Sequence, residues 1–328
     1  MKGKVDVCFG THVTTRDQHW EDVANAPMEK GQEVEICDGI RVSWLTDDLR
    51  EKLGEACQPR GYNIGRGAGP VVTYGLVREN APAGAWDPDG VLALIVALSR
   101  IVHPSAHGFN ASGSLHFSST GELDSVFAVN GDGAFRPPTQ RPWLTTSDWE
   151  DVGQLYRAYD ALPILQLPEL PQESSEPKRP VPLEKPKSMR RFPLRLHRAL
   201  WNLAYAAYVE PAHIRWLIVA TALEGLIETG VAARQEFIQR ILEIAKELGK
   251  PITRGEVDAI YSIRSTAAHR GWLSGKTDRE LDASYVPMDR IVGGVLRQAI
   301  SDDRFRMAFE SRETIAQRWP VVLTPEVM

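Results

Sequence analysis

Residues 253–271 read TRGEVDAIYSIRSTAAHRG, and this stretch decides how the second half of the chain is interpreted. Its first letters predict a capping box, because the Thr253 hydroxyl and the Glu256 carboxylate can satisfy each other's free amides at the start of a helix. Gly271 closes the pattern, as glycine commonly does just after a helix C-terminus. The sequence therefore predicts one helix that begins at Thr253 and runs to about Arg270.

One face of this helix is apolar except for a single arginine. At about 100° per residue, the positions on that face are Val257, Ile260, Tyr261, Arg264, Ala267 and Ala268. A guanidinium group cannot lose its charge, and burying it without a partner is very costly. We therefore expect Arg264 to meet a carboxylate, a phosphate or an interface cleft. His269 lies in the last turn, roughly 140° further around the helix, so the two side chains converge only at a loosened helix end or across two subunits.

An arginine and a histidine can together cleave RNA without a metal ion. The reaction needs a base for the 2′-hydroxyl proton, a cation for the charge that grows on the phosphate, and an acid for the leaving oxygen. Histidine titrates near neutral pH, and arginine can donate two hydrogen bonds to phosphate oxygens. One Arg–His pair lacks the second acid–base group, whereas two pairs related by a two-fold axis supply both.

The spacing of arginine and histidine is a weak signal by itself. Comparable spacings join Arg100 to His107, and Arg190 and Arg191 to His197. Proline interrupts them at Pro104 and Pro193, which breaks a continuous helix. Only Arg264 and His269 lie together in a capped amphipathic helix.

The remainder of the second half also has helical periodicity. One helix is indicated by Leu196, Leu200, Leu203 and Ala207, and another by Phe237, Ile241, Ile244, Ala245 and Leu248. The segment from Pro211 to about Ile227 is apolar nearly all round, so we expect a central buried helix there. Two further helices are predicted over Pro287–Ile300 and Asp302–Glu310. Short connections between them indicate an antiparallel bundle.

The first half has mixed signals that are typical of an α+β domain. Strands are predicted over residues 33–36, 40–44, 71–77, 114–117 and 125–129, and helices over residues 46–57, 87–102 and 147–162. Seven prolines between residues 163 and 187 predict an extended spacer. The chain is therefore divided into an α+β domain (residues 1–162), a proline-rich linker (163–187) and an all-α helical bundle (188–328).

Composition restricts the class of protein. No stretch reaches the roughly 18 apolar residues of a membrane helix, and no long apolar stretch follows Lys2 and Lys4. We therefore expect no signal peptide, and a cytoplasmic protein without membrane contact. The spacing of cysteine and histidine matches no standard metal site, and neither a metal nor a cofactor is expected. The net charge is −5, but from Ser188 onward 20 Lys and Arg stand against 17 Asp and Glu. This mild basic excess permits phosphate binding without requiring it.

Two segments resemble the HEPN superfamily. Tyr261–Gly271 is similar to the Arg-polar-x3-His signature of HEPN ribonucleases, with Ser265 in the polar position. Ala222–Leu226 reads ALEGL and resembles the Ala-Leu-Glu-x-Leu helix of the Apea-like branch. Arg270 departs from the pattern, because relatives often place glycine directly after the histidine. The resemblance covers about 140 residues and excludes the first domain.

The resemblance implies a HEPN-like helical bundle that forms a homodimer, with the Arg and His of both subunits lining one cleft. It implies an RNA substrate, with His269 as base or acid, Arg264 as phosphate clamp, Ser265 as polar helper and Glu224 as supporting carboxylate. Tyr261 is expected to pack in the core. Many members are ribonucleases of toxin or antiviral systems, so an antiphage effector is one implied role. A ligand or protein acting on the first domain would be its trigger.

Alternative interpretations stay open at this point. Arg264 and Glu224 would form a structural ion pair in a bundle that binds RNA, nucleotide or a protein partner without cleaving it. His269 would then interact only with the helix dipole. A further alternative places the activity in the first domain.

Overall fold

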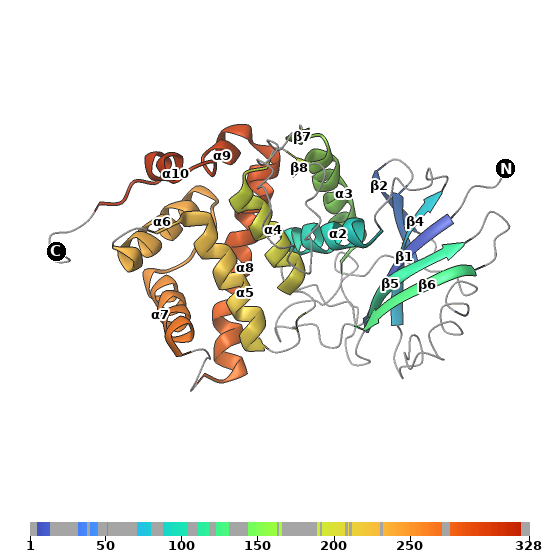
Figure 1. The fold of residues 1–328 in the computed structure, drawn as a ribbon, viewed down its shortest axis with the longest axis horizontal. Helices are drawn as coiled ribbons and strands as arrows, with labels where there is room; N and C mark the ends of the chain where they lie inside the picture. The colour runs from blue at the N-terminus through green and yellow to red at the C-terminus, as the bar shows by residue number, and fades with distance from the viewer. Residues whose placement is uncertain are drawn as a thin grey trace, which may run out of the picture.

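The structure is a computed structural model of the chain. It describes residues 5–13, 32–37, 40–44, 51, 71–79, 88–103, 111–117, 123–130, 144–162, 164–165, 189–190, 192–206, 209, 212–229, 232–270 and 276–322. Within those ranges, strands gather at one end of the molecule and helices at the other (Figure 1). None of the described helices is long and apolar enough to cross a membrane.

Six of the described strands form one sheet with antiparallel neighbours throughout. Its order is β2-β3-β4-β1-β5-β6, where β1 is Val5–Val13, β2 Glu33–Cys37, β3 Ile40–Trp44, β4 Val71–Glu79, β5 Ala111–Phe117 and β6 Leu123–Asn130. The five predicted strands are all present, and β5 and β6 are longer than expected. Strand β1 was not predicted, although it occupies an inner position between β4 and β5.

Two helices of the first half lie between the sheet and the helical end (Figure 1). Both were predicted: α2 is Pro88–Val102 and α3 is Thr146–Asp160. Helix α3 packs closely on β2 at Gly153, which has no Cβ atom. A Cβ added there would lie only 3.1 Å from the carbonyl oxygen of Glu35. Arg157 fastens this contact by donating to the carbonyl of Ile36 at 2.9 Å. Of the helix expected over residues 46–57, the structure describes only Glu51.

The linker region contributes one short pair of strands. β7 (Ile164–Leu165) and β8 (Met189–Arg190) pair antiparallel and bring the two ends of the proline-rich stretch together. Residues 166–188 lie outside the described part of the chain. The proposed division into domains stays a prediction.

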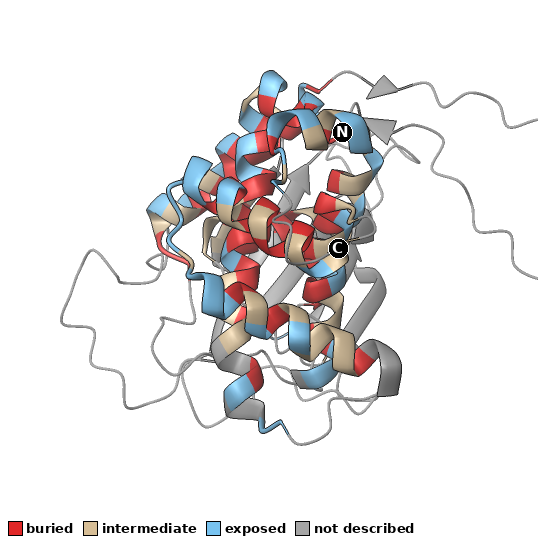
Figure 2. Cartoon of the chain, turned by 90° about the vertical axis from the view of Figure 1, so that its left-hand side faces the viewer, coloured by how far each residue is buried: buried red, intermediate tan, exposed pale blue. Residues whose placement is uncertain are grey.

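The described C-terminal region is helical, as expected. Its helices are α4 (Leu194–Ala206), α5 (Ala212–Ile227), α6 (Ala233–Glu247), α7 (Arg254–Arg270), α8 (Asp278–Ser301), α9 (Asp303–Met307) and α10 (Arg312–Arg318). Helix α5 packs against α4, α6, α7 and α8, as expected of a central helix, but it is not buried all round, because Ile214 is 42% exposed. Buried positions follow the inner sides of the helices, and exposed positions face outward (Figure 2).

Two predictions for the last helices were wrong. Pro287 does not begin a helix but lies inside α8, which starts nine residues earlier at Asp278. The start is fixed by a capping box in which Glu280 accepts from the Thr277 amide at 2.9 Å. The segment expected as one helix over Asp302–Glu310 contains only the short α9, and α10 follows as a separate helix.

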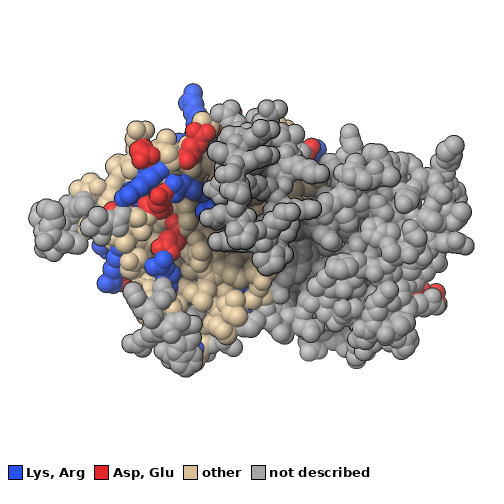
Figure 3. All heavy atoms as spheres, viewed as in Figure 1, with Lys and Arg blue, Asp and Glu red and all other residues tan. Residues whose placement is uncertain are grey.

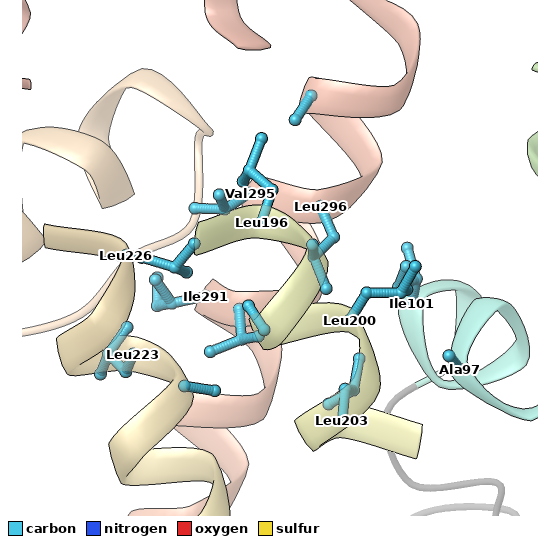
Figure 4. Close-up of a cluster of buried hydrophobic side chains, with 14 of the residues drawn as sticks. Ala97, Ile101, Leu196, Leu200, Leu203, Leu223, Leu226, Ile291, Val295 and Leu296 are labelled. Atoms are coloured by element: carbon cyan, nitrogen blue, oxygen red, sulfur yellow. The ribbon is translucent and has the colours of Figure 1, made fainter. Parts of the chain in front are cut away.

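One buried apolar cluster joins α2 to the C-terminal helices. Its members around α4 include Ala97, Ile101, Leu196, Leu200, Leu203, Leu223, Leu226, Ile291, Val295 and Leu296 (Figure 4). In this view Leu200 points from α4 toward Ile101 of α2. Helices α2 and α3 therefore pack against the C-terminal helices as well as against the sheet.

The first prediction concerns this shared cluster. Leu200 is 0% exposed, so Leu200→Ala should lower the free energy of unfolding by about 2–5 kcal/mol, because it removes apolar contacts and leaves a cavity. The control is Leu194→Ala on the same helix, where the side chain is 52% exposed and the expected change is below about 0.5 kcal/mol. Urea unfolding followed by tryptophan fluorescence measures both. Equal losses for the two variants would contradict the packing described for α4.

Candidate functional site

Helix α7 begins where the sequence predicts. The Thr253 amide donates to Glu256 Oε2 at 2.7 Å, and the Glu256 amide donates to Thr253 Oγ1 at 3.2 Å. The Thr253 amide and then the Thr253 hydroxyl, which both donate to the Glu256 carboxylate, lower the pKa of that carboxyl group. The capping box is therefore confirmed, and it fixes which residues of α7 share a face.

The apolar face of α7 contains the arginine that the sequence singles out. Val257, Ile260 and Ala267 are buried at 0%, 1% and 4% exposure. Tyr261 is partly buried and lies against Phe237 of α6, with ring centroids 5.4 Å apart. The Arg264 side chain is 33% exposed, so its guanidinium group lies at the edge of the core rather than within it.

Arg264 forms an ion pair with Glu224 of α5, between Nη2 and Oε2. The Glu224 side chain is 26% exposed. The structure thus joins two residues that are 40 positions apart, one from residues 222–226 and one from residues 261–271. The pair matches one of the partners expected for Arg264, and its partial exposure leaves both charges within reach of solvent.

The other candidate residues are described to different extents. Ser265 is partly buried on the turn that carries Arg264. The backbones of His269 and Arg270 form the last turn of α7, and their side chains lie outside the described residues. The structure therefore brings Arg264, Glu224 and Tyr261 into one region between α5, α6 and α7, and it does not describe the His269 imidazole relative to them.

A second charged pair adjoins this region and was missed from the sequence. Arg234 of α6 donates to Asp258 of α7 through Nε at 2.8 Å and Nη2 at 2.7 Å. This two-pronged contact lowers the pKa of the Asp258 carboxyl group. Asp258 stands out in no motif, because its partner lies 24 residues earlier. The pair braces α6 against α7 on the side of Tyr261.

Charges of both signs lie together on part of the molecular surface. On the face seen in Figure 3, Lys and Arg side chains of the described helices lie among Asp and Glu side chains. Elsewhere on the described helices, ion pairs join Arg318 to Glu247 and Arg195 to Glu228. A polyanion would therefore find short-range contacts on this face rather than a broad attractive field.

Side chains that ligate metals do not cluster within the described ranges. These ranges contain no group of three or more His, Cys, Asp or Glu side chains that could hold a metal ion. The groups that could act on a ligand in this region are a guanidinium, a carboxylate, a phenol and a hydroxyl group.

Comparisons with known proteins give no relative. No model of a known protein family matches the chain, and neither curated proteins nor solved structures provide a match. The interpretation of the site therefore depends on its own residues and on the motifs in residues 222–226 and 261–271.

The second prediction concerns the strength of the Arg264–Glu224 pair. Because both side chains are partly exposed, a double-mutant cycle with Arg264→Met and Glu224→Gln should give a coupling free energy of about 0.5–1 kcal/mol. Urea unfolding of the four proteins measures it. A coupling of about 3 kcal/mol or more would indicate a buried structural bridge and would contradict an arginine that is available to a ligand.

The buried Arg240 of α6 supplies a control. It pairs with Glu236 at 3.3 Å and donates to the carbonyl of Ile227 at 3.0 Å. Arg240→Met should cost about 2–4 kcal/mol, because buried acceptors lose their donor. A smaller loss than that of Arg264→Met would show that exposure does not rank these arginines.

Proposed function

We propose that the chain is a metal-independent endoribonuclease that acts through a dimeric HEPN-like Arg-x4-His site formed by Arg264 and His269. The observation that carries the proposal is the position of Arg264. A permanently charged group stands on the otherwise apolar face of α7, one-third exposed and paired with Glu224. Such an arrangement stabilises a cation without removing it from ligands in solution.

The chemistry assigns one role to each group. Arg264 would hold the scissile phosphate and stabilise the charge that develops on its oxygens. His269 would take the 2′-hydroxyl proton, and a second His269 would protonate the leaving oxygen. Glu224 would set the direction of the guanidinium group, and Ser265 would add a hydrogen bond. Arg270 would bring a second cation to the end of α7.

The need for two histidines is the reason to propose a homodimer. On a regular helix His269 points roughly 140° away from Arg264, so a single subunit offers poor convergence. A two-fold axis near the C-terminal end of α7 would place Arg264 of each subunit beside His269 of the other. Within this proposal the first domain receives a ligand or protein trigger, and defence against phage in the cytoplasm is a suitable role.

A second function is favoured by the same ion pair. Glu224 already neutralises Arg264, and charges of both signs lie side by side on the face of the molecule in Figure 3. These features also suit a HEPN-like module that binds RNA, nucleotide or a protein partner without catalysis. The two functions differ in whether covalent bonds in RNA are broken.

The third prediction separates these functions. The purified chain, incubated with labelled RNA and EDTA, should cleave it, and Arg264→Ala or His269→Ala should reduce the rate by about 100-fold or more. Products are counted on a denaturing gel. Arg254→Ala is the matched control, because Arg254 is an exposed arginine at the other end of α7, and it should keep the wild-type rate.

Two results would reject the proposed Arg264–His269 nuclease site. One is the absence of cleavage by wild-type protein at any RNA concentration, combined with RNA binding that Arg264→Ala weakens, which would support the binding module. The other is cleavage that both site variants retain in full, which would place the activity elsewhere in the chain.

A further inference from the structure

A buried charged network joins α2 to the C-terminal helices. Arg100 of α2 is 3% exposed, and its partners on α8 are Asp289 at 1% and Tyr285 at 2%. Arg100 Nη2 lies 2.7 Å from Asp289 Oδ1 and also donates to the Tyr285 hydroxyl group, while Nη1 donates to the carbonyl of Leu203 in α4 at 3.0 Å. One guanidinium group therefore connects three helices that are far apart in the sequence.

Stability alone does not account for this network. Taking two charges out of water is costly, and apolar side chains of similar size often stabilise a core as well or better. The cost is visible at Asp289, because burial raises the pKa of its carboxyl group to about 6 even though Arg100 opposes the shift. In addition, Arg100 Nε and Asp289 Oδ2 make no hydrogen bond among the described residues. The contacts are specific, yet they are expensive to form.

The geometry of the network fixes the position of α2 along its axis relative to α4 and α8. The three acceptors come from two helices, and only one placement of α2 presents Arg100 to all of them. The backbones are also close there, because a Cβ added at Gly293 of α8 would lie 3.5 Å from the Cα of Ile101. A slip of α2 by one turn, about 5.4 Å, would leave buried charges without partners. Such a slip would cost less free energy if only apolar side chains lay between the helices.

Helices α2 and α8 each extend this contact outward. On one side α2 packs against β1 and β5 of the sheet. On the other side α8 packs against α5, where the Trp216 indole donates to Ser284 at 2.8 Å. Helix α5 carries Glu224, the partner of Arg264. A continuous line of packed elements thus runs from the sheet to the candidate site, and Arg100 is its buried charged junction.

We propose that the network of Arg100, Tyr285 and Asp289 acts as a lock between α2, α4 and α8. The three helices then unfold locally as one unit. A displacement of the sheet therefore moves α8 together with α2, instead of separating α2 from α8. The lock goes beyond ribonuclease activity and does not depend on it. It is a property of the folded chain, with or without RNA.

The fourth prediction tests the lock by hydrogen exchange of the full chain followed by mass spectrometry. In the wild type, peptides from α2 and α8 should exchange through the same opening, with the same dependence on denaturant. The double variant Arg100→Met/Asp289→Leu keeps the volume and removes both charges, and it should stay folded. Its α2 peptides should exchange about tenfold faster or more than those of wild type, while the α8 peptides keep their rate.

A matched control uses the exposed pair between α3 and α8. Arg297 lies 3.0 Å from Asp151, with side-chain exposures of 48% and 36%. The variant Arg297→Met/Asp151→Leu removes the same charges between the same two halves of the chain, and it should leave both exchange rates unchanged, because exposed pairs contribute little. Tyr285→Phe provides a milder change, since it removes one hydroxyl group from the network and should speed α2 exchange by about threefold.

The outcomes are distinct. Faster exchange confined to α2 in the double variant and in Tyr285→Phe supports the lock. Unchanged exchange in both variants, or equal acceleration of α2 and α8, overturns it, because apolar packing would then couple the helices by itself. A double variant that no longer folds also overturns it, because the network would then be required for folding itself and not only for the coupling of α2 to α8. None of these readouts involves RNA, so a failure of the proposed function is detected separately.

Discussion

The buried contact of Arg100 with Asp289 constrains the rest of the molecule. Both charges are almost fully removed from water, so α2 must lie where the carboxylate, the Tyr285 hydroxyl group and the Leu203 carbonyl meet. That placement brings α2 against α4 and α8 and orients the sheet, which packs on the other side of α2. The apolar cluster of Figure 4 buries the surface that stabilises this arrangement. The charged contacts favour it over arrangements in which α2 is shifted along its axis.

The candidate site has the opposite character. Arg264 and Glu224 are also a guanidinium group and a carboxylate on neighbouring helices, but each keeps a quarter to a third of its side chain in water. A pair of this kind contributes little to stability and can exchange its internal partner for an external one. Arg264 is exposed enough to meet a ligand at α7, whereas Arg100 is buried and fixes how α2 packs.

How far the sequence leads is seen in particular residues. Local signals were read correctly where they repeat within a few positions: the capping box of Thr253 and Glu256, the apolar segment of α5, and the hairpin strands β2 and β3. The Arg264–Glu224 pair was among the expected partners because both residues belong to motifs. The Arg100–Asp289 contact spans 189 positions and leaves no periodic signal. The start of α8 lies at the capping box of Thr277 and Glu280 and not at Pro287, which α8 accommodates in its interior.

The sharing of one core between α2 and the C-terminal helices has a practical meaning for anyone who divides this chain. A fragment that begins after the proline-rich stretch would contain α4 and α8 but not α2. Leu200 and Leu203 would then face water, and Asp289 would keep its charge beside a newly wetted apolar surface. Such a piece is a candidate for self-association through the uncovered side, so the species it forms in solution would say more about the missing helix than about natural assembly.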